Sequence, residues 1–218
     1  MFKTKICGVT KRDDALDVVD SAADAIGLNF YPKSKRFVSR DTAKTICDVV
    51  GDQLLRVGVF VNENVRSILD TVEQTGIDAV QLHGDEPVEM LLELRSVPVI
   101  RAFRCKHGEL SEVVEFLRRA NAQGTPPAAV LLDAYHPGEY GGTGLTLDPA
   151  ELAERVSQLG GVHWVLAGGL NPENVSRASR VTGARGVDTA SGVESAPGIK
   201  DSTKVMAFSE NAWSEFNR

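Results

Sequence analysis

Short runs of β-branched and aliphatic residues alternate along the chain with segments of helical periodicity, and this alternation constrains the fold most strongly. The predicted strands are residues 3–7, 25–30, 56–61, 79–83, 99–103, 129–134, 163–168 and 186–190. The predicted helices are residues 11–22, 40–50, 63–75, 86–95, 111–122, 148–159, 172–180 and 201–216. Because each strand is followed by a helix, the strands should be parallel and joined by right-handed crossovers.

Eight strand–helix units favour a closed (β/α)8 barrel, the TIM barrel of the α/β class, over an open sheet of about six strands. The 218 residues lie near the lower size limit of such a barrel. No linker-like tract or charge block interrupts the pattern, so residues 1–218 are expected to form a single catalytic barrel domain.

Some helix boundaries and packing faces can also be predicted. Asn171–Pro172–Glu173 and Asp85–Glu86–Pro87 have the pattern of helix starts with proline at the first helical position. One stripe of the last helix carries Val205, Phe208, Ala212, Trp213 and Phe216. We therefore expect Trp213, like Trp164, to pack between barrel and helices.

Composition excludes several classes of protein. The formal net charge is −6, which disfavours binding to nucleic acid or to an anionic membrane. No apolar run approaches the ~18 residues of a membrane-spanning helix, and the N-terminus lacks the apolar region of a signal peptide. Three cysteines without a CxxC pair, and histidines without ligand-like spacing, predict neither a disulfide framework nor a metal site. A cytoplasmic location is expected.

Active sites of such barrels lie at the carboxyl ends of the strands. The candidate catalytic residues there are Cys7 and Asp133, and the candidate substrate-binding residues are His83, Asp188 and Arg36, the last in the loop after the second strand. Three of them have an alternative: Cys7 could be an inert core thiol, His83 could line the rim instead of hydrogen-bonding the substrate, and Asp133 could be a solvated carboxylate or an ion-pair partner. A thiolate base and a carboxylic acid facing a sugar phosphate would suit proton transfer at adjacent carbons, which favours an isomerase over a hydrolase.

Three glycine clusters follow the last three predicted strands: GGTG at 141–144, AGGL at 167–170 and ASGVE at 190–194. Glycine lets backbone N–H groups approach an anion closely, and these loops are the usual phosphate site of the fold. The predicted phosphate-binding residues are Gly142, Thr143, Gly144, Gly168, Gly169, Ser191 and Gly192. A single glycine pair would more often be a simple turn.

The sequence resembles phosphoribosylanthranilate isomerases of tryptophan biosynthesis from about residue 3 to residue 208. The resemblance is carried by KICGVT (5–10), GLNFYPKSKRFVS (27–39), VGVFVN (57–62), VQLHGDE (80–86), LLDA (131–134) with GGTG (141–144), LAGGLNPENV (166–175) and GVDTASGVES (186–195). The most specific elements are the opening KICG, the YPKSxRxVS segment and the closing GVDxxSGVE. The resemblance implies an Amadori rearrangement of N-(5-phosphoribosyl)anthranilate to 1-(2-carboxyphenylamino)-1-deoxyribulose 5-phosphate. It implies Cys7 as general base, Asp133 as general acid and Arg36 beside the anthranilate carboxylate, without a cofactor or metal.

The resemblance has a gap just after GGTG. Many members continue with a lysine, whereas this chain continues with Leu145, so any substrate contact from that lysine is in doubt. Two alternative functions stay open at this point. One is the histidine-pathway isomerase, which usually has aspartate at the position of Cys7, and the other is a barrel that binds a phosphorylated metabolite without turnover. The expected partner is a small phosphorylated substrate, and the chain is expected to be a monomer or homodimer.

Strand parity extends these expectations into the barrel. If Cys7 faces inward, Lys5 must do so as well, and Asp188 on the neighbouring eighth strand is its expected partner. The same parity predicts that Gln81 faces inward with His83, and Arg101 with Phe103. The charge of Lys5 is expected to lower the pKa of the Cys7 thiol toward neutrality.

Overall fold

Eight parallel strands close into a barrel in the computed structural model, which describes residues 1–105, 109–133 and 149–217. The barrel strands are β1 (Thr4–Cys7), β2 (Ala25–Asn29), β3 (Leu55–Phe60), β4 (Ala79–Leu82), β5 (Val99–Arg104), β6 (Ala129–Asp133), β7 (Trp164–Ala167) and β8 (Gly186–Thr189). They pair in chain order, and β8 closes on β1. The predicted α/β barrel is therefore confirmed.

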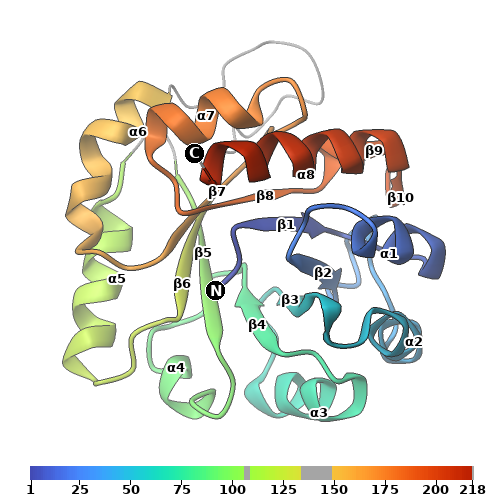
Figure 1. Cartoon of the computed structure of the whole chain (residues 1–218). Coiled ribbons are helices and arrows are strands. Elements are labelled where there is room, and N and C mark those ends of the chain that lie inside the picture. The colour runs from blue at the N-terminus through green and yellow to red at the C-terminus, as the bar shows by residue number, and fades with distance from the viewer. Residues whose placement is uncertain (106–108, 134–148, 218) are drawn as a thin grey trace.

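In the described part of the chain, eight α-helices follow the strands in chain order, and Figure 1 shows them arranged around the barrel. They are α1 (Arg12–Val19), α2 (Arg40–Val50), α3 (Val65–Thr75), α4 (Met90–Glu93), α5 (Ser111–Ala122), α6 (Pro149–Arg155), α7 (Val175–Thr182) and α8 (Ser202–Phe216). Short 3₁₀ turns occupy Gly51–Gln53, Val156–Leu159 and Ser191–Val193. The helices α2, α3 and α8 begin at side-chain caps, supplied by Ser39, Asn64 and Asp201.

The barrel and its helices bury two separate apolar layers. The barrel interior holds a small cluster of residues: Phe2, Ala25, Val57, Ala79, Ile100, Ala102, Ala129, Leu131, Val165 and Ala167. The larger layer lies between strands and helices and includes Ile6, Leu28 and Phe208. Because side chains alternate along each strand, one barrel residue contributes to the inner layer and the next to the outer.

Several predicted helix ends differ from the structure, most clearly at α4 and α7, and the predicted packing of Trp213 is wrong. Helix α4 spans only Met90–Glu93, not 86–95, because Glu86 accepts backbone hydrogen bonds from Asn62 and Gly84 and so belongs to a turn. Helix α7 begins at Val175, although Asn171 does cap the preceding turn by accepting from the N–H of Asn174. The side chain of Trp213 points outward and is 56% exposed, whereas Trp164 is buried as expected.

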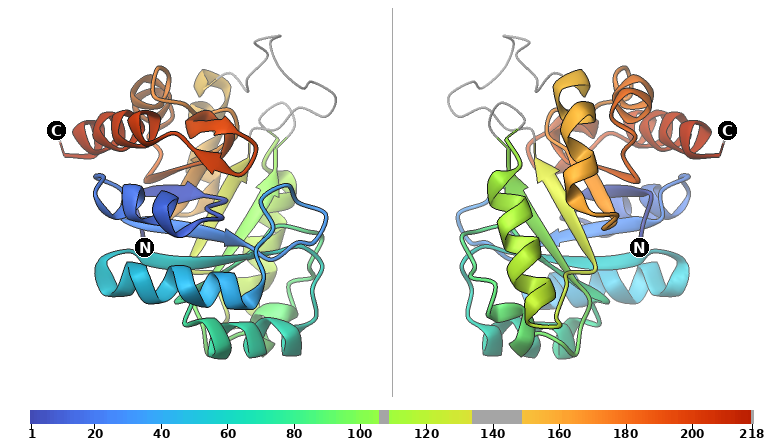
Figure 2. Two further views of the ribbon diagram at one scale, coloured as in Figure 1. Left: turned by 90° about the vertical axis from the view of Figure 1, so that its right-hand side faces the viewer. Right: turned by 90° about the vertical axis from the view of Figure 1, so that its left-hand side faces the viewer.

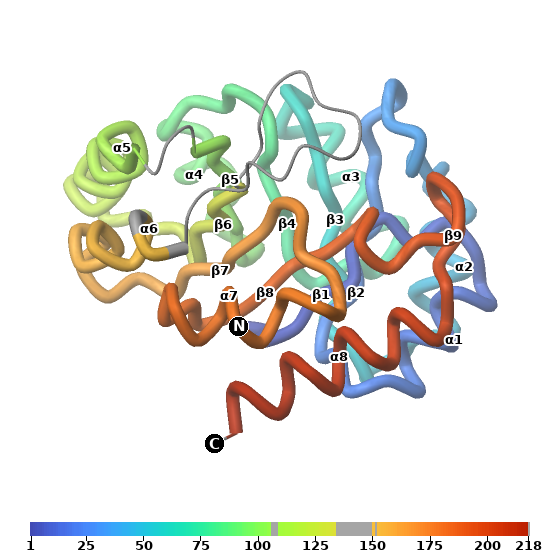
Figure 3. The backbone as a smooth tube through the Cα atoms, turned by 90° about the horizontal axis from the view of Figure 1, so that it is seen from above, coloured from blue at the N-terminus to red at the C-terminus, as the bar shows by residue number. Residues whose placement is uncertain are grey.

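An unpredicted hairpin of β9 (Glu194–Ala196) and β10 (Ile199–Lys200) lies between β8 and α8. Figures 2 and 3 show it beside the loop that follows β2. The backbone of Gly198 comes close to the carbonyl of Lys35, which leaves little room for a side chain there. Two segments more than 150 residues apart in sequence thus meet at the carboxyl end of the barrel.

Candidate active site

Cys7 ends β1 with its side chain on the inner side of the barrel. It is paired in register with Gly27 of β2, and a Cβ atom at Gly27 would lie only 2.7 Å from the Cys7 Sγ. Glycine at this position therefore leaves the space that the thiol occupies. Cys7 is only 9% exposed, so the thiol at the end of the strand is almost entirely buried.

Lys5 lies one inward position below Cys7 and forms the predicted ion pair with Asp188. Its Nζ is 2.7 Å from the Asp188 Oδ1, and its side chain is fully buried. The pKa of Lys5 is raised although burial acts to lower it, because Asp188 and Cys7 stabilise the cation. Lys5 and Asp188 therefore balance each other's charge inside the barrel.

The predicted fall in the pKa of Cys7 is wrong in its net direction. Burial raises the pKa of the thiol above 9.0, and the nearby cation of Lys5 opposes this rise without overcoming it. Asp188 also raises it, since it is a second negative charge near the thiolate. Lys5 thus lowers the pKa of Cys7 as predicted, but burial raises it by more.

Asp133 ends β6 beside His83, which follows β4. The His83 Nε2 lies 3.5 Å from the Asp133 Oδ2, and the two side chains are 22% and 21% exposed. Gln81 faces inward as predicted, and its Nε2 lies 3.0 Å from the Nδ1 of His83. If the Gln81 amide donates to Nδ1, the Nε2 of His83 is the ring nitrogen that faces the Asp133 carboxylate. Below them, burial raises the pKa of Asp188, and the cation of Lys5 opposes this rise.

Arg36 reaches the same end of the barrel from the loop after β2. Its aliphatic chain lies across Gly8, where a Cβ atom would be 2.3 Å from the Arg36 Cδ. The guanidinium donates from Nε and Nη2 to the two carboxylate oxygens of Glu194, both at 2.7 Å. These hydrogen bonds raise the pKa of Arg36. Arg36 is thus held directly above the backbone that follows Cys7.

The glycine loops after β7 and β8 pack against each other. Gly168 and Gly169 have φ angles of +91° and +67°, which glycine adopts without strain. A Cβ atom at Gly192 would meet the Leu170 carbonyl oxygen at 1.9 Å, so that position accepts only glycine without movement. Asn174 donates to the Gly169 carbonyl at 3.0 Å and fixes this peptide. The predicted residues Gly142, Thr143 and Gly144 lie outside the described residues.

The family model for N-(5'-phosphoribosyl)anthranilate (PRA) isomerase matches residues 4–211. The chain belongs to the phosphoribosylanthranilate isomerase family. It is 41% identical over 211 residues to the N-(5'-phosphoribosyl)anthranilate isomerase of Neisseria meningitidis serogroup A, covering 97% of this chain and 96% of that one. It therefore converts N-(5-phosphoribosyl)anthranilate to 1-(2-carboxyphenylamino)-1-deoxyribulose 5-phosphate in tryptophan biosynthesis, as the motifs predicted.

Solved structures of the family have the same fold. The isomerase of Thermotoga maritima matches with a TM-score of 0.83 and 41% identity, over 98% of this chain and all of that chain. A second isomerase structure, in complex with reduced 1-(o-carboxyphenylamino)-1-deoxyribulose 5-phosphate, matches with a TM-score of 0.80 and 38% identity over 98% and 100% of the two chains. That protein thus binds a phosphorylated analogue.

The prediction that Arg101 and Phe103 face the barrel interior is wrong. Gln81 pairs in register with Ile100, so Ile100 and Ala102 face inward and their neighbours face the helices. The Arg101 guanidinium lies 5.5 Å from the ring centroid of Phe116 on α5 and donates to the Leu82 carbonyl. Arg101 therefore joins β4 and β5 to the helical layer.

The two remaining thiols and His163 have structural environments. Burial raises the pKa of Cys47 to about 11 and that of Cys105 to about 12, so neither is a thiolate near neutral pH. His163 contacts the carbonyl of Phe2, and His107 and His136 lie outside the described residues. Among the described residues no group of three or more His, Cys, Asp or Glu side chains could hold a metal ion. No described helix is long and apolar enough to cross a bilayer.

Sequence reasoning missed Glu194 and Lys200 as members of this site. The Lys200 Nζ lies 3.0 Å from the Glu194 Oε1, and both side chains are nearly inaccessible to solvent. The signal for their meeting was Pro197–Gly198, a turn dipeptide between two short extended segments that predicts a hairpin. A hairpin brings Glu194 and Lys200 opposite each other.

Proposed function

We propose that Cys7 and Asp133 carry out the two proton transfers of the isomerisation and that Arg36 binds the substrate carboxylate. The single observation that carries this proposal is that Cys7 and Asp133 end two strands with inward-facing side chains, at the same end of one narrow barrel. Both are side chains whose two protonation states suit general acid–base work.

In the first step Asp133 donates a proton to the furanose ring oxygen. The bond between C1′ and that oxygen breaks, and the lone pair of the substrate nitrogen forms an iminium with C1′. His83, 3.5 Å from the Asp133 carboxylate, stabilises the anion that Asp133 becomes. Gln81 holds the ring of His83 in position through Nδ1.

In the second step the Cys7 thiolate removes the C2′ proton, which the iminium has made acidic. The electrons of the broken C–H bond form an enolamine, which tautomerises to the ketone product. Lys5 favours the thiolate because its cation opposes the effect of burial on the Cys7 pKa. No cofactor is needed, because the substrate nitrogen supplies the electrophile.

The substrate phosphate is proposed to bind the backbone N–H groups of Gly168, Gly169, Ser191 and Gly192, together with Gly142, Thr143 and Gly144. Two features support this: the left-handed glycines after β7, and the close packing of Gly192 on the Leu170 carbonyl, which together fix the loop backbone. Fixed amide groups at the ends of the last barrel strands are well suited to a phosphate monoester. Asp188 is the remaining proposed substrate contact, through the oxygen that Lys5 does not bind.

We further propose that the chain acts in the cytoplasm, as a monomer or a homodimer. The site residues described above all come from one chain, so a single copy can assemble them. Sedimentation velocity at micromolar concentration distinguishes monomer from dimer.

Complementation tests the proposed roles. In a tryptophan auxotroph that lacks this isomerase, the wild-type chain should restore growth, and Cys7→Ala or Asp133→Asn should not. Cys47→Ala and Asp48→Asn are the matched controls, because Cys47 is a buried thiol and Asp48 an exposed carboxylate, both on helix α2. Growth with Cys7→Ala or Asp133→Asn at wild-type rate would refute the role of that residue.

A further inference from the structure

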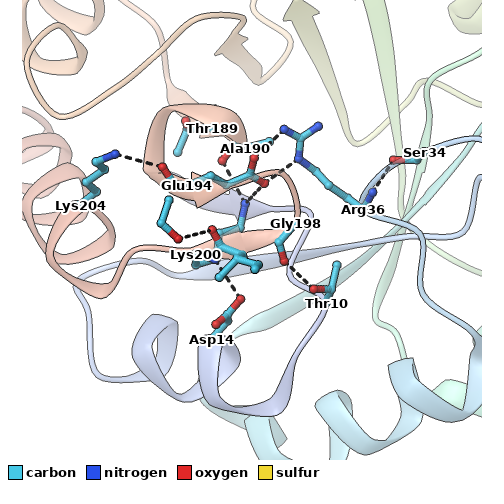
Figure 4. A network of polar contacts seen from close by, with 12 residues as sticks. Thr10, Asp14, Ser34, Arg36, Thr189, Ala190, Glu194, Gly198, Lys200 and Lys204 are labelled. Carbon is cyan, nitrogen blue, oxygen red and sulfur yellow. Dashed lines mark hydrogen bonds and ion pairs between the residues drawn. The ribbon is translucent and has the colours of Figure 1, made fainter.

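Glu194 occupies one edge of the Arg36 guanidinium. Nε and Nη2 of Arg36 each donate to a different oxygen of the carboxylate at 2.7 Å, which is the bidentate geometry of a strong charge-assisted pair. Figure 4 shows this pair and the polar network behind it. The pair thereby holds the planar guanidinium of Arg36 in one orientation.

The other edge of the Arg36 guanidinium, between Nη1 and Nη2, has no acceptor among the described residues. An arginine has five N–H donors, and the pair with Glu194 uses two of them. The remaining edge can form a second bidentate contact, and a carboxylate is the ligand that fits it. The Arg36 side chain is 25% exposed, so this edge is reachable.

Glu194 is itself fixed by buried contacts. Its side chain is 5% exposed, and its Oε1 accepts from the Nζ of Lys200 at 3.0 Å. Lys200 is fully buried and donates a second bond to the Ala190 carbonyl at the end of β8. Lys204 donates to the Glu194 carbonyl at 3.0 Å. Arg36 and Lys200 together lower the pKa of Glu194 although burial acts to raise it, so the carboxylate is ionised.

The hairpin that carries Glu194 is anchored to the segment after β1. The backbone N–H of Lys200 donates to the Asp14 carboxylate at 3.0 Å, and the Thr10 hydroxyl donates to the Gly198 carbonyl at 2.6 Å (Figure 4). The chain of Arg36 lies on Gly8 of the same segment. Arg36 is therefore located by two independent contacts, one on its stem and one on its guanidinium.

The charged side chains of this cluster do not sum to zero. Arg36, Lys200 and Lys204 are three basic side chains and Glu194 and Asp14 are two carboxylates, so the cluster has one positive charge more than it has negative charges. Lys200 is buried behind Glu194, whereas the Arg36 side chain is 25% exposed. The excess charge is thus available at the free edge of Arg36.

We infer that Glu194, backed by Lys200, is a positioning residue that orients Arg36 to select substrates bearing a carboxylate on the aromatic amine. This inference rests on the proposed role of Arg36. Without Glu194 the guanidinium samples several rotamers, and the carboxylate then binds a side chain that is not oriented in advance. The loss falls on recognition of the carboxylate and leaves the proton transfers by Cys7 and Asp133 intact.

Two substrates test the inference: N-(5-phosphoribosyl)anthranilate, and the analogue made from aniline, which lacks the carboxylate. The measured quantity is the ratio of their kcat/KM values. Glu194→Gln should lower this ratio about 10- to 100-fold, the usual range for a lost hydrogen bond to a charged group, through a higher KM for the anthranilate substrate. Arg36→Met should lower it at least as far. The double variant should be no worse than Arg36→Met alone, since Glu194 acts through Arg36.

Asp78→Asn is the matched control. Asp78 accepts from the Nε and Nη2 of Arg56 at 2.8 and 2.6 Å, the same bidentate geometry at the opposite end of the barrel strands. Asp78→Asn should leave the ratio of the two kcat/KM values unchanged. In the double variant Glu194→Gln/Lys200→Met, no buried lysine is left without its carboxylate partner. This double variant should lower the ratio of kcat/KM values by the same factor as Glu194→Gln alone.

The results distinguish failure of the inferred positioning role of Glu194 from failure of the proposed carboxylate-binding role of Arg36. If Arg36→Met lowers the ratio and both Glu194 variants keep it at the wild-type value, the inference is wrong and the role of Arg36 stands. If Arg36→Met itself keeps the ratio, the carboxylate role of Arg36 is wrong and the inference fails with it.

Discussion

The Nζ of Lys5 lies 2.7 Å from the Oδ1 of Asp188, where β1 and β8 close the barrel one inward position below Cys7. Gly27 on β2 makes room for both Lys5 and Cys7, since its missing Cβ would lie 3.1 Å from the Lys5 Cε. The Cys7 thiol, the Lys5 cation and the buried Asp188 carboxylate therefore form one unit. Removing any one of them changes the electrostatic environment of the other two.

Lys5→Met should raise the pKa of Cys7 further, because the cation that opposes burial is lost. The rise of kcat/KM with pH, which follows formation of the thiolate, should then move to higher pH. Modification of Cys7 by iodoacetamide near neutral pH should become slower, as followed by mass spectrometry. Lys5→Met with Asp188→Asn leaves no lone buried charge and controls for misfolding. If the modification rate is unchanged in both variants, Lys5 does not favour the Cys7 thiolate and this account of Lys5 is wrong.

Arg36→Ala should raise the KM for N-(5-phosphoribosyl)anthranilate while kcat changes little, because a binding contact is lost and the acid and base remain. The carboxylate of Glu194 would lose its bidentate partner but keep Lys200. Steady-state kinetics measure both constants. A variant whose only defect is in kcat would contradict the assignment.

Gly192→Ala should weaken binding of the substrate phosphate, since the new Cβ would force the loop away from the Leu170 carbonyl. The KM and the inhibition constant of inorganic phosphate should rise together. Gly160→Ala is the control, because Gly160 has a φ of +64° but open space around its Cβ position. A complex structure with the phosphate nearer β2 and β3 would rule out the glycine loops as the phosphate site.

Glu194 should make part of the free energy of unfolding depend on pH. Its pKa is lowered in the folded chain, so the stability it contributes is present above its unfolded value of about 4.3 and is lost as pH falls through the folded value. At pH 7, Glu194→Gln should cost about 3–5 kcal/mol, because it leaves buried Lys200 without its carboxylate. Urea unfolding should show this difference shrinking at strongly acidic pH. A difference independent of pH would contradict the ion pair.

The barrel could be predicted because its signals are local and repeated. Every strand is a short apolar run, and every crossover has helical periodicity, so eight units implied closure. The pairing of Lys5 with Asp188 followed from the same logic, since parity fixed the face and closure fixed the neighbour. Cys7, Asp133 and His83 came together for the same reason, as residues at parallel strand ends.

The errors arose where tertiary packing decides between two local choices. Strand parity alone does not fix the register of β5, which pairs Gln81 with Ile100 and so turns Arg101 and Phe103 toward the helices. Trp213 fits the apolar stripe of α8, although its position lies at the exposed margin of that stripe. Glu194 was missed because its partner Arg36 lies 158 residues away in the chain. Only the folded loops bring these two residues together.

Steady-state turnover of Cys7→Ala and Asp133→Asn tests the central claim most directly. Each variant should keep wild-type circular dichroism and lose kcat by a factor of about 10² to 10⁴, because one general base or acid contributes that much. Cys7→Ser should also be slow, since a serine hydroxyl hardly ionises near neutral pH. A folded Cys7→Ala or Asp133→Asn variant that turns over N-(5-phosphoribosyl)anthranilate at near wild-type kcat would contradict the account.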